Sequence, residues 1–535
     1  MNALLTTVPP WLVLTLAAAV VLATPRSVGH TVAAVATGFV FVQALMIPDG
    51  AHLDVLFLGF DVVLLNVDQF SAMMGLVVGF LATAAVIYAY SSEAPRWLTA
   101  FALTYVASTV GTIYAGDWLT VIFFWELMAV TSTLLVWQYG GEAVRAGYRY
   151  AIFHGVSGTI LLGAVVVHFA NAGTFLFAET GIHASAAVLA AIGIGINCGF
   201  VFLHTWIPDT YPRPHIAASV FLSVFTTKTA VYVMYRAFPE GGWWLAYLGG
   251  FMAVYGVFFA LLQYDPRRLL SYHIQAQVGY MLAGIGLATL GGEWGRFAVA
   301  GGFAHLFNNV LYKSLLFMVV GVVVYRTGSN YIKDMGGLWK VMPVAFLVYL
   351  VGAASITAVP GFNGYISKGL VIDATEQVNN VPLLFGYDLL WWLLMIGAVG
   401  TFMSFIKLGY YIFFHGEAKP GHRGLGDAKP IQTVGMGLAA AACVGLGVVY
   451  SAQIDLLPFA DTVHDLSNPY SYYLDPLQFG HIEKALALMT VGFVAFFSLK
   501  RPLGWLAHHV RDVDVLINPA AFYAGRGAIW GVTEL

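Results

Sequence analysis

The sequence predicts an all-α polytopic membrane protein with about 14 or 15 transmembrane helices. Three observations lead to this prediction: the composition, the length of the apolar runs and the placement of basic residues. Of the 535 residues, 59% are hydrophobic and only 10% are charged. A soluble chain carries about 25% charged residues.

Apolar runs of about twenty residues mark the spans, because about 30 Å of hydrocarbon requires that length of helix. The twelfth run contains ITAVPGFNGYISK, where Pro360, Gly361 and Gly364 should break the helix. Irregular backbone at membrane depth is tolerated only beside protein or water, so this break indicates an internal aqueous path. The fifteen predicted spans cover roughly 10–24, 30–48, 68–91, 97–115, 117–138, 148–171, 184–207, 215–238, 243–263, 268–290, 296–326, 341–375, 388–415, 432–451 and 483–499.

Basic residues support this count of spans. Most of the 24 Lys and Arg residues fall on alternate connections and on the C-terminal tail, whereas the opposite side has only Arg236, Arg296 and Lys484. The positive-inside rule then places the N-terminus outside and the C-terminus in the cytoplasm of a multi-pass protein of the cell membrane. We read no signal peptide, because the N-terminus lacks a basic region.

The segments between the spans carry no recognisable catalytic motif. Residues 49–67 alternate like a short β-hairpin on the outer face, and residues 452–482 form an acidic, aromatic outer loop. Cys198 and Cys443 provide neither a disulfide framework nor a CxxC metal site. We expect no metal and no cofactor, and the scattered basic residues exclude a nucleic-acid surface.

Five charged residues fall inside predicted spans: Glu126, Lys228, Lys313, Lys368 and Lys407. A carboxylate near the middle of a membrane helix costs on the order of 2.5–3.5 kcal/mol, so Glu126 favours a functional interpretation. Lys407 fits a snorkelling side chain equally well.

Two of these lysines have polar neighbours. Lys313 follows His305 and Asn309 at intervals of four residues, which predicts one slowly drifting polar stripe on a helix. Lys228 lies among serine and threonine hydroxyls that could hold water. Because burial shifts the pKa of amines and carboxylates and couples neighbouring groups, such a row can carry protons.

Four motifs follow one another along the chain: FLHTWIPDTYPRPHIAASVFLSVFTTKTAVYVMYR (202–236), DPRRLLSYHIQAQVGYMLAGIG (265–286), HLFNNVLYKSLLFMVVG (305–321) and PGFNGYISKG (360–369). In this order they resemble the antiporter-like subunits of complex I, of Mrp-type multisubunit cation/proton antiporters and of membrane-bound hydrogenases. The resemblance runs from about residue 60 to 415 and leans toward the D-type antiporter subunit.

The resemblance implies two inverted five-helix repeats, each containing a broken helix. Residues 93–238 would form the first repeat and 243–415 the second. Residues 1–92 would add peripheral N-terminal helices, and 416–535 C-terminal helices with a cytoplasmic tail.

The resemblance also implies a proton pathway through Glu126, Lys228, His305, Lys313 and Lys368. Further candidates are Lys407, His154, Asn197, His273 and Asn309. At Asn197 the sequence departs from the family, which usually places a lysine there to pair with the glutamate. Glu126 would then find His154 or a cation of another subunit.

We therefore expect a subunit of a Na+/H+ antiporter complex that works in the lipid bilayer with other membrane subunits and moves H+ and, as a further hypothesis, Na+. The alternatives are a proton-pumping module of a redox complex, an energy-coupling subunit for uptake of a solute such as inorganic carbon, and a self-sufficient transporter. The chain itself is expected to be an ion-transport subunit rather than an enzyme, although its host complex could be redox-driven.

Overall fold

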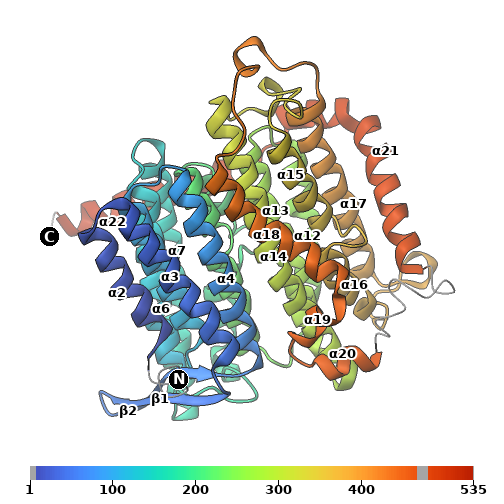
Figure 1. Cartoon of the computed structure of the whole chain (residues 1–535). Helices are drawn as coiled ribbons and strands as arrows, with labels where there is room; N and C mark the ends of the chain where they lie inside the picture. Colours follow the sequence, from blue (N-terminus) through green and yellow to red (C-terminus); the bar gives the residue numbers. More distant parts are fainter. Residues whose placement is uncertain (1–7, 467–479, 534–535) are drawn as a thin grey trace.

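A computed structural model describes residues 8–466 and 480–533, which form a membrane bundle of near-parallel helices (Figure 1). Within these ranges, ten helices are long and apolar enough to cross a membrane, and three shorter helices are also apolar. Every predicted span overlaps a helix or two consecutive helices. The predicted all-α polytopic fold is confirmed.

The first half of the chain packs as one group of helices (Figure 1). Its long helices begin beside Pro, Asp or Gly residues that stop the preceding segment. The helices of this half are α2 (Pro10–Ala23), α3 (Arg26–Met46), α4 (Gln69–Ser91), α5 (Arg96–Ile113), α6 (Trp118–Trp137), α7 (Glu142–Ala172), α8 (Ala187–Cys198), α9 (Trp206–Thr210), α10 (Ile216–Leu222) and α11 (Phe225–Ala237).

The second half surrounds α14, the longest helix, whose middle and C-terminal parts are buried by its neighbours. The helices of this half are α12 (Trp243–Leu262), α13 (Pro266–Gly286), α14 (Gly292–Thr327), α15 (Pro343–Ile356), α16 (Asn363–Thr375), α17 (Leu389–Gly409), α18 (Pro430–Val448), α19 (Tyr450–Asp455), α20 (Ala460–Leu466), α21 (Gly480–His509) and α22 (Asp514–Thr533).

Three spans consist of two half-helices, α8–α9, α10–α11 and α15–α16. The predicted break in the twelfth span is confirmed, because α15 ends at Ile356 and α16 begins at Asn363. Between them Ala358 and Gly361 have φ angles of 61° and 90°, which a continuous helix cannot accommodate. Gly364 lets α16 approach α15, because a Cβ at this position would lie 1.8 Å from the Ser355 carbonyl oxygen.

The predicted hairpin is also confirmed. Strands β1 (Gly50–Phe57) and β2 (Phe60–Val67) pair antiparallel, with Gly50 opposite Val67 and Phe57 opposite Phe60. Asp117, the N-cap of α6, accepts a hydrogen bond of 2.7 Å from the Val63 amide. This contact fixes the hairpin against α6.

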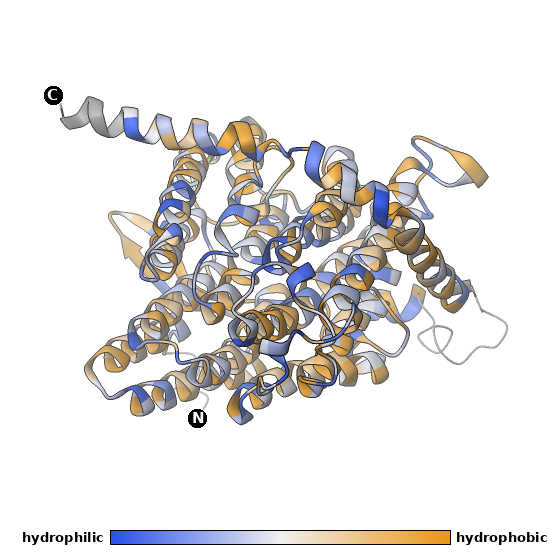
Figure 2. Ribbon diagram, turned by 90° about the horizontal axis from the view of Figure 1, so that it is seen from above, coloured by the Kyte–Doolittle hydropathy of each residue, from blue (hydrophilic) through white to orange (hydrophobic). Residues whose placement is uncertain are grey.

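Residues 514–533, which fall within the predicted C-terminal segment, form helix α22. Seen from above, α22 lies across one edge of the bundle and extends beyond it (Figure 2), with Phe522 packed against Tyr148 of α7. Part of the predicted loop 452–482 forms α19 and α20, and residues 467–479 lie outside the described ranges.

A buried polar contact fastens this C-terminal segment. Asp512, between α21 and α22, accepts hydrogen bonds from His204 (3.0 Å), Tyr272 (2.6 Å) and Tyr255. His204 belongs to the irregular segment between α8 and α9. The connection of α21 to α22 is therefore attached directly beside a helix break.

We predict that Asp512→Ala loosens this attachment. Breaking a buried pair costs about 3–5 kcal/mol, so the apparent melting temperature in detergent should fall by several degrees. Trypsin should also cleave faster after Arg511. The control is Glu417→Ala, because the Glu417 side chain is 89% exposed. The prediction would be contradicted if Asp512→Ala and Glu417→Ala had the same melting temperature and the same rate of cleavage by trypsin.

Candidate functional site

Three lysines from three different spans lie in the core of the bundle. Lys228 on α11, Lys313 on α14 and Lys368 on α16 are 1%, 0% and 2% exposed. Lys228 and Lys368 both act electrostatically on Lys313, so the three side chains share one region of the interior. No salt bridge in residues 8–466 or 480–533 includes any of them.

Lys228 lies at the interruption between α10 and α11. Its Nζ donates to the Ser223 carbonyl oxygen at 2.9 Å and to Thr227 Oγ1 at 3.2 Å. Ser223 is the C-cap of α10, where helix carbonyls have no partner in the next turn. The interrupted helix thus provides a backbone acceptor for the ammonium.

Lys368 is held in the same way at the break between α15 and α16. Its Nζ donates to the Ile356 carbonyl oxygen at 2.9 Å and lies 4.9 Å from the centre of the Tyr280 ring. Ile356 is the last residue of α15. The negative end of a helix dipole and the face of an aromatic ring both favour a cation at this position.

Lys313 has a different environment, because its buried Nζ has no hydrogen-bond partner among the described residues. Both ring nitrogens of His273 and the Oδ1 of Asn309 also lack partners there. Buried polar groups need hydrogen bonds, so we expect water molecules in this cluster to provide the hydrogen bonds that the protein does not.

His305 connects this cluster to the broken helix. Its Nδ1 and Ser367 Oγ are 3.2 Å apart, and its Nε2 lies 3.1 Å from Gln277 Oε1. Sequence reasoning overlooked Gln277 and Ser367. Gln277 follows His273 by four residues on α13, and this spacing could have identified it.

Glu126 lies in a different environment from the lysines, at the side of the bundle. It is half-buried on α6 and faces a hollow of about 700 Å³ lined by apolar residues of the hairpin, α6 and α7. Gly158 of α7 makes room for it, because a Cβ there would lie 1.5 Å from Glu126 Oε1. The carboxylate therefore opens toward the side of the bundle.

The proposed pairing of Glu126 with His154 is not present. His154 stacks on Tyr150, with ring centres 3.9 Å apart, and meets the Trp206 ring at 4.6 Å. Its Nδ1 lies 3.0 Å from the Tyr150 carbonyl oxygen. In the described part of the chain no hydrogen bond or salt bridge joins it to Glu126, because aromatic packing holds the imidazole inside.

Asn197 and Lys407 complete the set of candidates. Asn197 is buried at the end of α8, and neither atom of its amide has a partner within the described ranges. Lys407 is buried rather than snorkelling, since its Nζ donates to the carbonyl oxygens of Leu261 and Gln263, both at 2.6 Å. These carbonyls lie at the C-terminal end of α12, so Lys407 caps that helix.

Comparisons with known proteins agree with this architecture. The profile of the family described as NADH:quinone oxidoreductase/Mrp antiporter, TM matches residues 115–404. The D-type Na(+)/H(+) antiporter subunit of Alkalihalophilus pseudofirmus is 26% identical over 73% of this chain and 83% of its own length. The A-type subunit of the same organism is 25% identical over 66% of this chain, which spans about half of that relative, 48%.

Solved structures share the fold. A chain of the Mrp complex from Dietzia sp. matches 98% of this chain and 59% of its own length, with 20% identity and a TM-score of 0.82. A chain of an archaeal membrane-bound sulfane sulfur reductase matches 99% of this chain and 95% of its own length, with 20% identity and a TM-score of 0.77. On its sequence and its architecture, this multi-pass membrane chain belongs to the NADH:quinone oxidoreductase/Mrp antiporter transmembrane family.

Proposed function

We propose that this chain is a proton-translocating subunit of a multisubunit Na+/H+ antiporter. The observation that carries the proposal is the row of buried lysines Lys228, Lys313 and Lys368, which has no carboxylate partner in the described ranges. Burial and nearby like charges disfavour the protonated form of an amine, so such groups exchange protons with a hydrated path. The relative named as a D-type Na(+)/H(+) antiporter subunit supports the same activity.

Because the three lysines lie close together, the protonation of one is coupled to the protonation of the next. When one lysine gains a proton, its charge makes protonation of the next less favourable. A proton arriving at Lys313 thus acts on Lys228 and on Lys368, because both interact with it electrostatically. His305, His273 and Asn309 provide further polar atoms along this route.

Other membrane subunits complete the site at Glu126. A carboxylate in a membrane span normally faces protein or water, yet Glu126 opens to an apolar hollow at the side of this chain. A neighbouring subunit that covers the hollow would shield it from lipid and could provide the cation that Asn197 cannot. Relatives named as subunits of antiporters support such an assembly.

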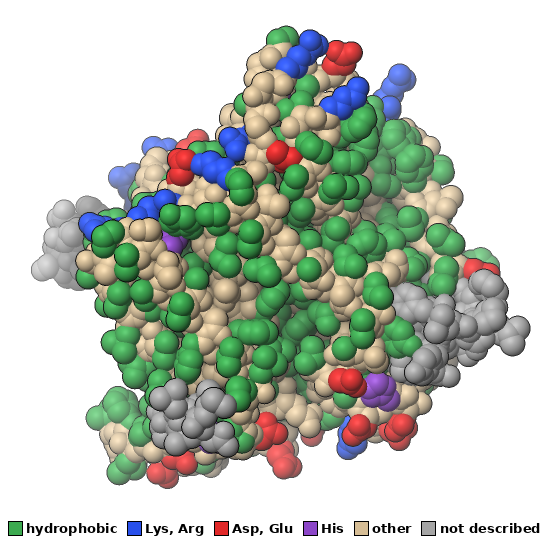
Figure 3. Space-filling view, viewed as in Figure 1, with side chains coloured by type: hydrophobic (Ala, Val, Ile, Leu, Met, Phe, Trp, Pro, Cys, Tyr) green, Lys and Arg blue, Asp and Glu red, His purple; other side chains and the backbone are tan. Residues whose placement is uncertain are grey.

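The charge distribution supports a cell-membrane location with a cytoplasmic C-terminus. In Figure 3, Lys and Arg side chains gather along the upper edge, and acidic side chains along the lower edge. The upper edge is the one that carries α22 in Figure 1. By the positive-inside rule this edge faces the cytoplasm.

A second candidate is a proton-pumping subunit of a redox-driven complex. The specific observation is the fold match to a chain of an archaeal respiratory membrane complex over 99% of this chain. Identification of the subunits that copurify with this chain separates the two functions: other antiporter subunits favour the first, and redox subunits favour the second.

We predict that Glu126→Gln abolishes most of the transport while the complex still assembles. Loss of a positioned proton carrier lowers rates on the order of 100-fold. The measurement is Na+-driven proton movement, followed with a pH-sensitive dye in proteoliposomes that contain the whole complex. Normal transport by this variant would remove Glu126 from the pathway.

We predict that Gly158→Ala impairs transport in the same way, because the added methyl group must displace the Glu126 carboxylate. The matched control is Gly155→Ala on the same helix, where no atom lies within 4 Å of the new Cβ. Equal transport by the two variants would show that the position of this carboxylate does not matter.

Lys313→Ala should reduce transport more than Lys407→Ala. Lys313 has no protein partner among the described residues, whereas Lys407 caps α12 near the end of its own span. We therefore expect the Lys407 variant to lose mainly stability, measured as a lower melting temperature. The opposite order of transport rates would contradict a pathway through Lys313.

A further inference from the structure

Lys368 also borders a small chamber whose lining does not include Lys313. The chamber lies between α16, α17 and α21 and has a volume of about 50 Å³. One water needs about 10–15 Å³ by this measure, so the space holds a few water molecules. Tyr365, Asp373, Ala398, Lys484, Ala485 and Leu488 are among the residues that line it.

Three charged residues line this chamber: Lys368, Asp373 and Lys484. Asp373 follows Lys368 on α16, and Lys484 of α21 forms a salt bridge of 2.7 Å with Glu376. The side chains of Lys484 and Glu376 are 35% and 32% exposed, so this pair lies at the mouth. Asp373 acts electrostatically on Lys484, which places both carboxylates near the same ammonium.

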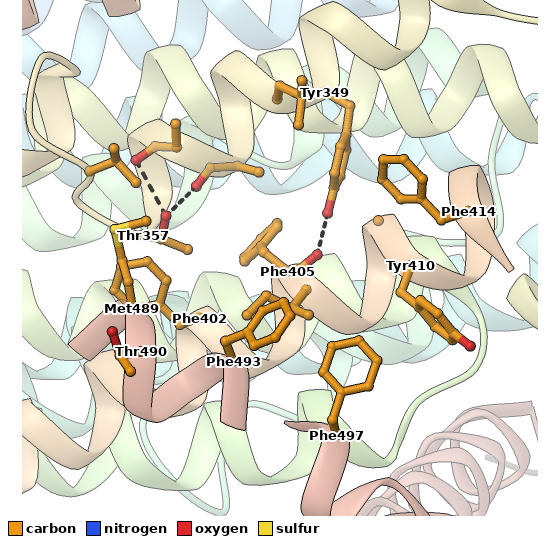
Figure 4. Close-up of a pocket in the computed structure, with 16 residues that line it drawn as sticks. Tyr349, Thr357, Phe402, Phe405, Tyr410, Phe414, Met489, Thr490, Phe493 and Phe497 are labelled. Carbon is orange, nitrogen blue, oxygen red and sulfur yellow. Dashed lines mark hydrogen bonds between the residues drawn. The ribbon is translucent and has the colours of Figure 1, made fainter. Parts of the chain in front are cut away.

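The opposite side of the chamber is closed to ions. Thr357 and Phe402 separate it from a much larger cleft of about 710 Å³ between α15, α17 and α21 (Figure 4). The side chains labelled there are mostly aromatic, and the cleft is lined by uncharged residues throughout. An apolar cleft offers no stabilisation to a charge, so the cleft is an unfavourable route for an ion from Lys368, whereas the chamber reaches the charged Lys484.

We propose that this chamber is the outer end of the ion path through Lys368, with Asp373 as the next proton acceptor and the Lys484–Glu376 pair as its gate. The inference rests on the function proposed above. In the outward direction, an N–H bond of the Lys368 ammonium breaks and an O–H bond forms on Asp373 through chamber water, which leaves a neutral amine. Separation of Lys484 from Glu376 then exposes the protonated Asp373 to outer water, where the O–H bond breaks again.

The proposal can be tested by blocking the chamber. Ala485→Trp fills it, because Ala485 lines the chamber and is 7% exposed, whereas the adjacent Leu486 is 52% exposed on the outside of α21. In the reconstituted complex, Ala485→Trp should lower ion flux about tenfold or more, and Leu486→Trp should leave it unchanged. Unchanged flux with an assembled Ala485→Trp complex would overturn the proposal.

A second measurement does not depend on transport. In the whole complex, the thiol of Leu488→Cys should react with Ag+ added from outside. The bound Ag+ would then protect this thiol from a maleimide that is added after denaturation. The thiol of Val491→Cys, the control, should remain unprotected. Leu488 lines the chamber, whereas Val491 is 53% exposed on the apolar surface, and both native cysteines are buried. If the Leu488→Cys thiol does not react with Ag+, the proposal that this chamber is the outer end of the ion path is overturned. If the Leu488→Cys thiol reacts with Ag+ but the unmodified complex moves no ions, the chamber is supported and the proposed transport function is contradicted.

Discussion

A buried amine in a membrane protein must be solvated by something other than bulk water, and the arrangement of this bundle follows from that constraint. An unpartnered charge in a low-dielectric interior is very costly. At Lys228 and Lys368 the protein meets the cost with carbonyl oxygens at the ends of α10 and α15. A continuous helix would use those carbonyls in its own hydrogen bonds. Each of these two lysines therefore depends on the interruption of a span, which leaves a carbonyl free to accept from its ammonium.

The same constraint explains the polar residues between the lysines. Lys313 lies on an uninterrupted helix, where the helix uses its own carbonyls. Among the described residues its Nζ has no hydrogen-bond partner, and neither have the His273 ring nitrogens and Asn309 Oδ1. A dry interior of this kind would be unstable, because each unsatisfied buried group costs about 1–3 kcal/mol. Hydration of this region and its capacity to carry protons are thus expected together, whereas the Lys407 ammonium already donates to two carbonyl oxygens at the end of α12.

The spans, the hairpin and the break in the twelfth span could be predicted because each depends on local sequence. Hydropathy determines which segments enter the membrane, and Pro360 with Gly361 and Gly364 determines where a helix cannot continue. The buried lysines could be predicted as well, because charge within an apolar run is visible in the sequence.

The direction in which a side chain faces depends instead on tertiary packing. The sequence predicted His154 or a cation of another subunit as the partner of Glu126. His154 stacks on Tyr150 instead, and the Glu126 carboxylate lies in the space left at Gly158. His204 and Asp512 are in contact although they lie 308 positions apart in the sequence, and no local sequence pattern predicts such a contact. The chamber beside Lys368 likewise depends on α21, which is distant in sequence from α16.

Proton transfer along the three lysines requires a hydrated interior between Lys228 and Lys368. The most direct measurement is an electron cryo-microscopy structure of the purified complex in lipid nanodiscs at a resolution that shows ordered water. We predict water within hydrogen-bonding distance of Lys313 Nζ and of the His273 ring, connected toward Lys368. A Lys313 enclosed only by apolar side chains, with no water in any resolved state, would contradict the account.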